Sequence, residues 1–276
     1  MLTDKEIISF QKNGYLIKKS KELDSIDYLQ NKVFNLISKK NRKLINFSKS
    51  NKTVLFQKLH RHINRKSLNE IRLSVVKGIN SDSKFYKSYY RSAAEMLDGL
   101  VGNEIAVQKK INISIQIPND DKSMLPMHSD IYAGESPFEV VAWIPLTDVK
   151  KSTHSMFITS PKENPKINKE VTKSNNKTVI KIFNKYRKKF KFLEIKFGEV
   201  LIFTPILLHG NVVNKTKETR ISLNCRFKSL LTPYDVFSKT HRNIPHFFKP
   251  LIIKPLTKIG FNFINAVNKK KYNPNL

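Results

Sequence analysis

Residues 199–228 read EVLIFTPILLHGNVVNKTKETRISLNCRFK, and this stretch indicates the fold class more directly than any other. It contains short runs rich in β-branched and large apolar residues, separated by turn residues: 200–204, 207–213 and 219–228. Such runs are typical of strands. Because the polar dipeptide Asn214-Lys215 lies between the last two runs, it predicts a hairpin turn.

Similar runs begin after Gly102 and extend the β pattern upstream: 105–117, 127–132, 138–146, 155–159 and 192–196. The chain before Gly102 is different, because apolar residues between about 24 and 100 recur at helical spacing. Thr3 and Glu6 form a capping-box pattern ahead of a first helix, which Gly14 ends. Many short strands after a helical segment predict a double-sheet barrel with helices packed outside.

The same pattern predicts one domain in three parts, with no low-complexity linker between them. Residues 1–100 form a mainly helical part, 101–232 the barrel core and 233–276 a tail. The segment 177–190 inserts a helix into the core, because its apolar residues lie on one helical face. A chain of 276 residues can form one large core, and its 39% of hydrophobic residues are sufficient to fill that core.

The cysteine content and the apolar runs predict where the protein resides. Cys225 is the single cysteine, so no internal disulfide can form, and this favours a reducing cytoplasm. Residues 1–6 contain no apolar secretory segment. No run reaches the roughly 18 apolar residues of a membrane span. We therefore expect a cytoplasmic protein without a transmembrane segment.

The formal net charge of +29 comes mostly from lysine, which is spread along the chain among many Asn and Ile residues. A basic surface attracts nucleic acid, anionic lipid or acidic metabolites. An AT-rich genome produces the same mixture without selection for binding, and the aromatic-interleaved patches of RNA-binding modules are missing. Nucleic acid is therefore not the expected partner. The apolar tail, 244–267, is interrupted by prolines and either packs on the barrel, covers the substrate or contacts a membrane surface.

The most informative motif is the triplet His128-Ser129-Asp130 within the run 127–132. Side chains two residues apart on a strand point to the same face, so His128 and Asp130 can offer a nitrogen and an oxygen to one metal ion. Two histidines and one carboxylate on one face of an octahedron suit non-haem iron(II). Alone, the triplet is weak evidence, because most such triplets are surface accidents.

His209 is the candidate for the third ligand, because it follows four apolar residues. A core histidine bonded to a backbone carbonyl would have the same local sequence. If the predicted hairpin is symmetric, however, His209 pairs directly with Arg220, with Cβ atoms about 5 Å apart. An inward arginine requires an anion, and a dicarboxylate cosubstrate supplies one through a bidentate contact. Ser222 shares that face and adds a hydroxyl donor.

Taken together, the motifs resemble those of the phytanoyl-CoA dioxygenase-like branch of the iron(II)/2-oxoglutarate oxygenases. The matching motifs cover nearly the whole chain: LT..EI..F..NGY at 2–15, HSD at 128–130, WIPLTD at 143–148, GEVLIF at 198–203, HGN at 209–211 and TRIS at 219–222. The residues around His128 and Trp143 are most similar to a bacterial subfamily found sporadically in surface-carbohydrate biosynthesis clusters. The sequence ITSPK at 158–162 replaces the Pro-Gly-Ser-His turn of many relatives, which concerns the substrate mouth and not the iron.

This resemblance implies a mainly β fold with α-helices. Its core would be a double-stranded β-helix of the jelly-roll or cupin type, with the N-terminal helices packed outside. It also implies that His128, Asp130 and His209 bind Fe(II), and that Arg220, with Ser222, binds the distal carboxylate of 2-oxoglutarate. The reaction would consume O2 and 2-oxoglutarate. Because halogenases of this branch lack the carboxylate ligand, Asp130 argues against halogenation.

Four further residues are weaker candidates. Asn112 and Gln116 alternate before the His128 triplet and could contact the keto-acid end of the cosubstrate, although polar residues on an outer face would look the same. Trp143 is a candidate for substrate contact, with a barrel-core tryptophan as the alternative. Arg226 falls on the same alternation as Arg220 and is a second substrate candidate, unless it forms a surface ion pair.

The sequence thus predicts a 2-oxoglutarate-dependent non-haem iron dioxygenase, most simply a hydroxylase. The favoured substrate is an anionic carbohydrate, such as a nucleotide sugar or a glycan precursor in surface-polysaccharide biosynthesis, as the subfamily resemblance implies. A lipid or acyl-CoA-type substrate is the alternative, consistent with the broader branch and the apolar tail. A basic module that binds nucleic acid or membranes, with an inactive barrel, is the alternative of another class, and the complete set of motifs argues against it.

Overall fold

Two antiparallel β-sheets form the centre of the protein in this computed structural model, which describes residues 2–41, 44, 51–133, 137–174, 176–232 and 247–267. The larger sheet contains β1 (Tyr15–Lys19), β2 (Ile105–Gln108), β3 (Asn112–Gln116), β4 (Glu139–Pro145), β7 (Glu199–Phe203), β9 (Arg220–Ser229) and β10 (Phe248–Ile252). The smaller sheet contains β5 (Met156–Ile158), β6 (Lys191–Phe192) and β8 (His209–Asn211).

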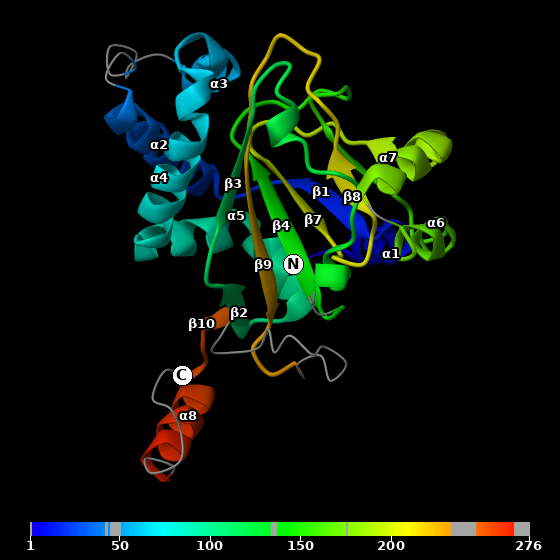
Figure 1. Cartoon of the computed structure of the whole chain (residues 1–276). Helices are drawn as coiled ribbons and strands as arrows, with labels where there is room; N and C mark the ends of the chain where they lie inside the picture. The colour runs from blue at the N-terminus through cyan, green and yellow to red at the C-terminus, as the bar shows by residue number, and fades with distance from the viewer. Residues whose placement is uncertain are drawn as a thin grey trace.

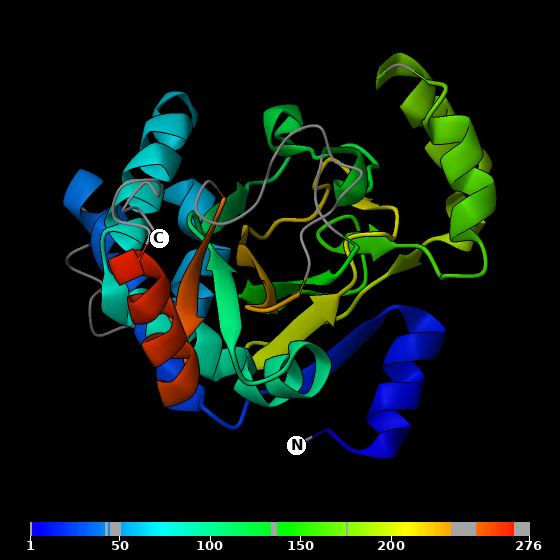
Figure 2. The same ribbon diagram turned by 90° about the horizontal axis from the view of Figure 1, so that it is seen from below.

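The helices lie outside this pair of sheets, as Figures 1 and 2 show. They are α1 (Asp4–Asn13), α2 (Leu23–Lys40), α3 (Lys52–Gln57), α4 (Leu68–Asn80), α5 (Ser83–Val101), α6 (Asn164–Val171), α7 (Asn176–Lys185) and α8 (Pro255–Val267). Helices α2, α3 and α4 lie on one side of the molecule, and α6 and α7 on the other (Figure 1). The arrangement confirms the predicted mixed fold, with two sheets in the centre and the N-terminal helices outside.

Strand β9 is the longest strand among the described residues and organises the larger sheet, whose order is β1-β7-β4-β9-β2-β10, with β3 beside β9. One edge of β9 pairs with β4, and the other pairs first with β3 and then with β2. Its side chains alternate between an apolar face and a polar face. The apolar face contains Ile221, Leu223, Cys225 and Phe227, and the polar face contains Arg220, Ser222, Asn224, Arg226 and Lys228.

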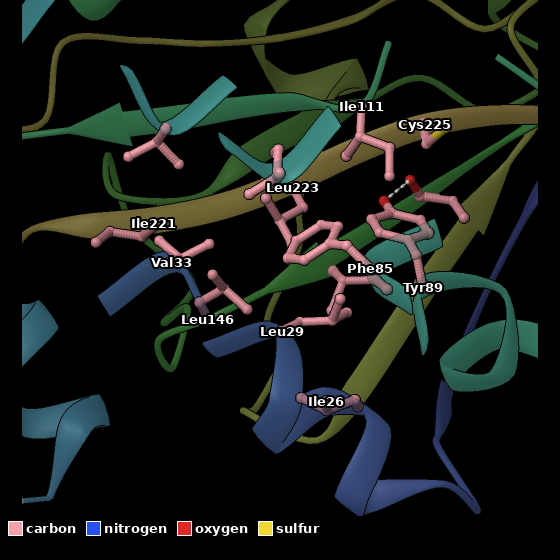
Figure 3. Close-up of a cluster of buried hydrophobic side chains, with 14 of the residues drawn as sticks. Ile26, Leu29, Val33, Phe85, Tyr89, Ile111, Leu146, Ile221, Leu223 and Cys225 are labelled. Atoms are coloured by element: carbon pink, nitrogen blue, oxygen red, sulfur yellow. Dashed lines mark hydrogen bonds between the residues drawn. The ribbon is translucent and has the colours of Figure 1, made fainter. Parts of the chain in front are cut away.

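The apolar face of the larger sheet packs against the N-terminal helices and forms the main core. Leu29 and Val33 of α2 and Phe85 and Tyr89 of α5 are buried there, beside Leu223 of β9 (Figure 3). The predicted helical spacing between about 24 and 100 is therefore confirmed, because the repeating apolar positions form this contact. This layer fixes β9 from outside the barrel.

A second, smaller core lies between the two sheets. Val141, Trp143, Leu201 and Phe203 of the larger sheet pack there with Met156 and Ile158 of β5, among other side chains. A third cluster covers the outer face of the smaller sheet, where Phe157 contacts Phe183 and Phe190 of the segment predicted as a helical insertion. That prediction is confirmed, because α7 (Asn176–Lys185) covers most of the segment 177–190.

The first helix begins and ends as its sequence predicts. Thr3 caps the first turn through its hydroxyl, which accepts from the Glu6 amide, and the Glu6 carboxylate accepts from the Thr3 amide in return. Gly14 ends the helix in the left-handed region at φ 72°, where a residue with a Cβ would be strained. The chain then enters β1, which pairs with β7.

Two predicted strands are wrong in a way that matters for the site. The run 127–132 is not a strand: His128 forms one isolated bridge, and a 3-10 turn begins at Asp130. The ladder stops there because Pro126 has no amide hydrogen and the Asp130 amide bonds to the Pro205 carbonyl instead. The run 105–117 splits into β2 and β3.

The predicted hairpin between His209 and Arg220 is also wrong. His209 belongs to β8, which pairs with β5, whereas Arg220 belongs to β9 and pairs with Gln116. The segment between them crosses from one sheet to the other. Asn214 directs this crossing, because its side-chain amide donates to the carbonyls of Gln116 and Glu218.

The tail contains two elements that the sequence did not predict, β10 and α8, while residues 233–246 and 268–276 lie outside the described residues. Pro255 stands at the first position of α8, where the missing amide hydrogen of proline costs nothing. Helix α6 was not predicted either. Within the described ranges, no helix combines the length and the apolar character required to cross a membrane.

Tyr89→Phe tests how α5 is fastened to the larger sheet. The Tyr89 hydroxyl donates to the carbonyl of Ala142 at 2.8 Å, and both residues are buried. Losing this bond should lower the free energy of unfolding by about 1–2 kcal/mol, measured by urea denaturation. Tyr90→Phe is the matched control, because the Tyr90 hydroxyl bonds to Asp98 at the exposed surface. An equal loss in both variants would contradict this account.

Candidate metal centre

Three side chains meet at one point inside the barrel: His128, Asp130 and His209. The Oδ1 atom of Asp130 lies 3.4 Å from Nε2 of His128 and 3.9 Å from Nε2 of His209. All three possible ligand atoms lie within 4.8 Å of one another. His209 and Asp130 are buried, whereas the His128 side chain is 33% exposed, so the site is open on the His128 side.

Backbone hydrogen bonds bring these residues together. His128 and His209 exchange two bonds, at 3.0 and 2.9 Å, so the segment before Asp130 is fastened to β8. The Asp130 amide donates to the carbonyl of Pro205, and the Ser129 hydroxyl lies within bonding distance of the same carbonyl. Gly210 permits this close approach, because a Cβ there would lie only 2.8 Å from the carbonyl oxygen of Leu125.

Each histidine ring is oriented by a hydrogen bond to the backbone carbonyl two residues before it. Nδ1 of His128 lies 2.8 Å from the carbonyl oxygen of Pro126, and Nδ1 of His209 lies 2.9 Å from that of Leu207. A carbonyl oxygen only accepts, so each Nδ1 carries the hydrogen and each Nε2 presents its lone pair to the centre. This is the tautomer that a metal ion requires of both rings.

The donor set fits an iron-type ion. Two imidazole nitrogens and one carboxylate oxygen on one side leave the remaining positions open, which is the ligand set of non-haem Fe(II) sites. Bonds of about 2.1 Å at right angles place neighbouring ligand atoms about 3 Å apart. The two separations from Asp130, 3.4 and 3.9 Å, are close to this value, and the three atoms lie within 4.8 Å of one another, so binding an ion would draw the ligands together.

The surroundings keep two of these ligands unprotonated. Burial lowers the pKa of His209 to about 4, and the nearby His128 lowers it further. Burial alone would raise the pKa of Asp130, but the neighbouring His128, His209 and Arg226 side chains hold it well below its usual range. A neutral imidazole and an ionised carboxylate are the forms that bind a metal ion.

Arg226 has a partner that the sequence did not indicate. Its Nη2 atom lies 2.9 Å from Oδ2 of Asp130, and its Nη1 atom donates to the side-chain oxygen of Gln108. The carboxylate of Asp130 is therefore used at both oxygens, with Oδ1 toward the histidines and Oδ2 toward Arg226. The predicted role of Arg226 in substrate contact stays a prediction, whereas the alternative of a surface ion pair is wrong, because both partners are largely buried.

Arg220 lies on the same interior face of β9, six residues before Arg226, and is 2% exposed. Its guanidinium donates to the carbonyl of His154 and to the hydroxyl of Ser114, and it lies 5.7 Å from the ring of Trp143. Over the ranges that the structure describes, no carboxylate forms an ion pair with it, and its Nε is without a partner. Burial lowers the pKa of Arg220 to about 10, so the group remains charged at neutral pH.

The other candidates from the sequence lie on this interior face as well. Gln116 pairs with Arg220, and Asn112 pairs with Asn224, so the alternative of an outer face is wrong for both. The Gln116 side chain donates to the carbonyl of Val212 at 2.6 Å, while its oxygen has no partner. The hydroxyl of Ser222 is buried without a partner. Trp143 is 6% exposed and belongs to the core between the sheets, where it also contacts Arg220.

His154 is a residue of the site that the sequence did not reveal. It is 1% exposed, neither ring nitrogen has a hydrogen-bond partner, and its carbonyl accepts from Arg220. His154 stands in the connection between β4 and β5, where no periodic pattern distinguishes it from a surface histidine. No signal in the sequence could have placed it beside Arg220, because that contact depends on how the loop folds over the barrel.

Comparison with known proteins supports the fold. No protein-family model matches the chain, and no curated protein matches it significantly. HygX from Streptomyces hygroscopicus, solved with nickel and 2-oxoglutarate bound, is 12% identical over 84% of this chain and 89% of that chain, with a TM-score of 0.51. HygX with iron bound gives the same identity and TM-score, over 85% and 90% of the two chains. EctD from S. alaskensis, solved with 2-oxoglutarate and 5-hydroxyectoine, is 14% identical over 83% of this chain and 76% of that chain, with a TM-score of 0.48.

At these identities the likeness establishes the fold alone. The chain has the double-stranded β-helix fold shared with HygX, in which a larger and a smaller antiparallel sheet face each other with helices outside. This confirms the fold that the sequence resemblance implied. The surface-carbohydrate subfamily receives no support from the comparisons.

Arg226→Gln tests whether Arg226 positions Asp130. Without the guanidinium, the Oδ2 atom of Asp130 loses its partner and the carboxylate can turn away from the histidines. The affinity for Fe(II), or for Co(II) as a redox-stable probe, should fall about 10- to 100-fold by anaerobic titration calorimetry. Arg91→Gln, at an exposed arginine of α5, is the matched control and should keep the wild-type affinity. Unchanged affinity in folded Arg226→Gln protein would refute this role.

His154→Leu tests a contribution of this buried imidazole to acid sensitivity. Burial, together with the positive charge of Arg220, lowers the pKa of His154 from 6.5 to about 4. The unfolded chain therefore protonates His154 more readily than the folded protein does. The stability that depends on a neutral His154 is fully present above pH 6.5 and is lost as pH falls toward 4. Between those pH values, the free energy of unfolding of the metal-free variant should fall less than that of wild type, by up to about 3 kcal/mol. Parallel denaturant titrations check this, and identical slopes would contradict it.

Proposed function

We propose that the protein is an Fe(II)- and 2-oxoglutarate-dependent oxygenase. The observation that carries this proposal is a buried arginine without a carboxylate partner, Arg220, on the same interior face that leads to the set His128, Asp130 and His209. Neither feature alone would be sufficient. A metal site without an anion pocket would suit many reactions, and a buried cation alone would suit any anionic ligand.

Arg220 supports an anionic cosubstrate. Taking an unpaired charge out of water costs several kcal/mol, and its present contacts are with neutral groups only: a carbonyl, a hydroxyl and an aromatic ring. A carboxylate would offset this cost through the planar guanidinium fork. The partnerless hydroxyl of Ser222 stands two residues further along the same face and can donate to the same anion.

The arrangement along β9 favours a ligand that bridges Arg220 and the metal centre. The Cα atoms of Arg220 and Arg226 are about 20 Å apart along the strand, because each residue advances about 3.3 Å. The distance between the functional groups is shorter than this. The Arg220 guanidinium lies over Trp143, which pairs with Asn224, so it points along β9 toward Arg226, and Arg226 in turn contacts Asp130. A short dicarboxylate with a keto-acid end could thus use Arg220 at one end and the metal at the other.

The protein's own residues would orient and protect the reactants. His128 and His209 present fixed Nε2 atoms, Arg226 holds Asp130 in one orientation, and the apolar core between the sheets keeps water from the buried side. Bound iron(II) would supply the redox chemistry, in which O2 converts 2-oxoglutarate to succinate and carbon dioxide and one oxygen atom enters the substrate. The second oxygen atom ends in succinate.

For the substrate we propose an anionic carbohydrate, such as a nucleotide sugar or a glycan precursor. The support is the sequence resemblance around His128 and Trp143, together with the net charge of +29, which attracts acidic metabolites. Trp143 and Arg226 stay candidates for substrate contact.

Arg220→Gln tests the cosubstrate site. In wild type, anaerobic addition of Fe(II) and 2-oxoglutarate should produce the visible iron-to-ketoacid charge-transfer band. In Arg220→Gln the 2-oxoglutarate concentration for half-maximal absorbance should rise at least 10-fold, because the charge-assisted contact is lost. His209→Ala should abolish the band and the release of succinate, and Arg91→Gln should behave as wild type. A folded wild-type protein that gives no band would overturn the proposed function.

Nucleotide sugars, acyl-CoA thioesters and amino acids can be compared as substrates through succinate release. We expect the strongest stimulation from nucleotide sugars, because their phosphates complement the basic charge. A response confined to acyl-CoA thioesters or amino acids would exclude the carbohydrate proposal while leaving the oxygenase chemistry in place.

A further inference from the structure

Helix α8 stands apart from both sheets. Figure 1 shows it projecting beyond β10, away from the rest of the molecule. Hydrogen bonds hold its N-terminal end: the Lys254 amide and the Thr257 hydroxyl both donate to the carboxylate of Glu104, at 2.8 and 3.0 Å. Phe261 packs against the small cluster around Phe248. The helix therefore has an anchored side and a free side.

The free side is apolar. Leu256 is 80% exposed and Ile259 is 64% exposed, and with Ile253 they follow one another at intervals of three residues. Leu256 is the most exposed large apolar side chain in the part of the chain that the structure describes. The helix has 13 residues, of which Lys258 is the only charged one. Exposed apolar side chains gathered on one face typically mark a surface that another body covers.

The charge around α8 indicates what kind of partner covers its apolar face. No Asp or Glu occurs after Asp235, whereas basic residues are frequent there: Lys239, Arg242, Lys249, Lys254, Lys258 and Lys269–Lys271. In the structure Lys254 and Lys258 are exposed beside the apolar stripe. A complementary partner has negative charge at its surface and an apolar layer a few ångströms below it. A bilayer containing anionic lipids has both.

We propose that α8 docks on an anionic lipid surface, with Leu256 and Ile259 inserted at the boundary of the acyl chains and Lys254 and Lys258 against the headgroup phosphates. The helix cannot span a bilayer, because 13 residues extend about 20 Å and the hydrocarbon core is about 30 Å thick. It therefore lies in the interface. A second copy of this chain is a poorer occupant, because it would bring the same lysines together.

The metal centre lies toward the same end of the barrel as α8. Arg226, which bonds to Asp130, stands four residues before Leu230, or about 13 Å along the chain in extended conformation. The Leu230 amide bonds to Glu104, the residue that anchors α8. Docking would thus hold the metal centre close to the lipid surface. It requires none of the proposed oxygenase chemistry, so either proposal can fail without the other.

Vesicle sedimentation tests the docking with the full chain. Wild type should sediment with vesicles of phosphatidylcholine mixed with phosphatidylglycerol, and only weakly with phosphatidylcholine alone. Leu256→Asp/Ile259→Asp should reduce the partition coefficient at least 10-fold, because both apolar contacts are lost and negative charge is added. Leu73→Asp is the matched control: Leu73 is 61% exposed, but it lies on α4, and its variant should bind as wild type.

Lys254→Glu/Lys258→Glu separates the two parts of the proposal. This variant should lose the preference for anionic vesicles while its residual binding to phosphatidylcholine stays at the wild-type level. Equal sedimentation of wild type and Leu256→Asp/Ile259→Asp would overturn the proposal, because binding would then depend on the general basic charge. A wild-type dimer that dissociates in Leu256→Asp/Ile259→Asp, with no vesicle binding, would assign the stripe to a second copy instead.

Discussion

The reciprocal backbone pair between His128 and His209 is the contact on which the metal site depends. These two hydrogen bonds join the segment before Asp130 to the smaller sheet, and a further bond from the Asn211 amide to the Leu125 carbonyl continues the contact. The register also sets the spacing of the rings, whose centroids lie 4.4 Å apart. A shift of one residue would turn one ring away from the centre. The geometry of the site is therefore a consequence of backbone pairing, and side-chain contacts refine it.

The site also depends on the layer outside the barrel. The interior face of β9 contains buried polar and charged groups, which cost stability because they leave water. The opposite face of the same strand buries Ile221, Leu223 and Phe227 against the N-terminal helices, which offsets that cost. One strand thus combines a functional face with a stabilising face. The helical layer thus stabilises a sheet whose interior face carries the charged Arg220.

Strand alternation made much of this arrangement predictable. Polar and apolar residues alternate strictly from Arg220 to Lys228, so the sequence indicates two faces and places Arg220, Ser222 and Arg226 together. The placement of His209 and Arg220 in different sheets was not predictable in the same way, because a symmetric hairpin and a crossing between sheets have the same turn residues. The side-chain bonds of Asn214 select the crossing, and they depend on β3, which is distant in sequence. Long-range contacts of this kind leave no local periodicity.

Comparing His128 with His209 shows how the expected three side chains can meet although the local backbone was predicted incorrectly. The triplet was expected to share a strand face, yet Asp130 lies in a 3-10 turn and is oriented by Pro205 and Arg226. The residue types could be proposed without the correct backbone, because the chemistry limits which side chains can bind such an ion. The backbone has more freedom, since a bridge followed by a tight turn presents the same two ligand atoms as a strand does. The residue types of a metal site are therefore easier to infer from sequence than the backbone that holds them. The partners behind the site, such as Arg226 beside Asp130 and His154 beside Arg220, are harder still, because their contacts depend on how distant segments pack.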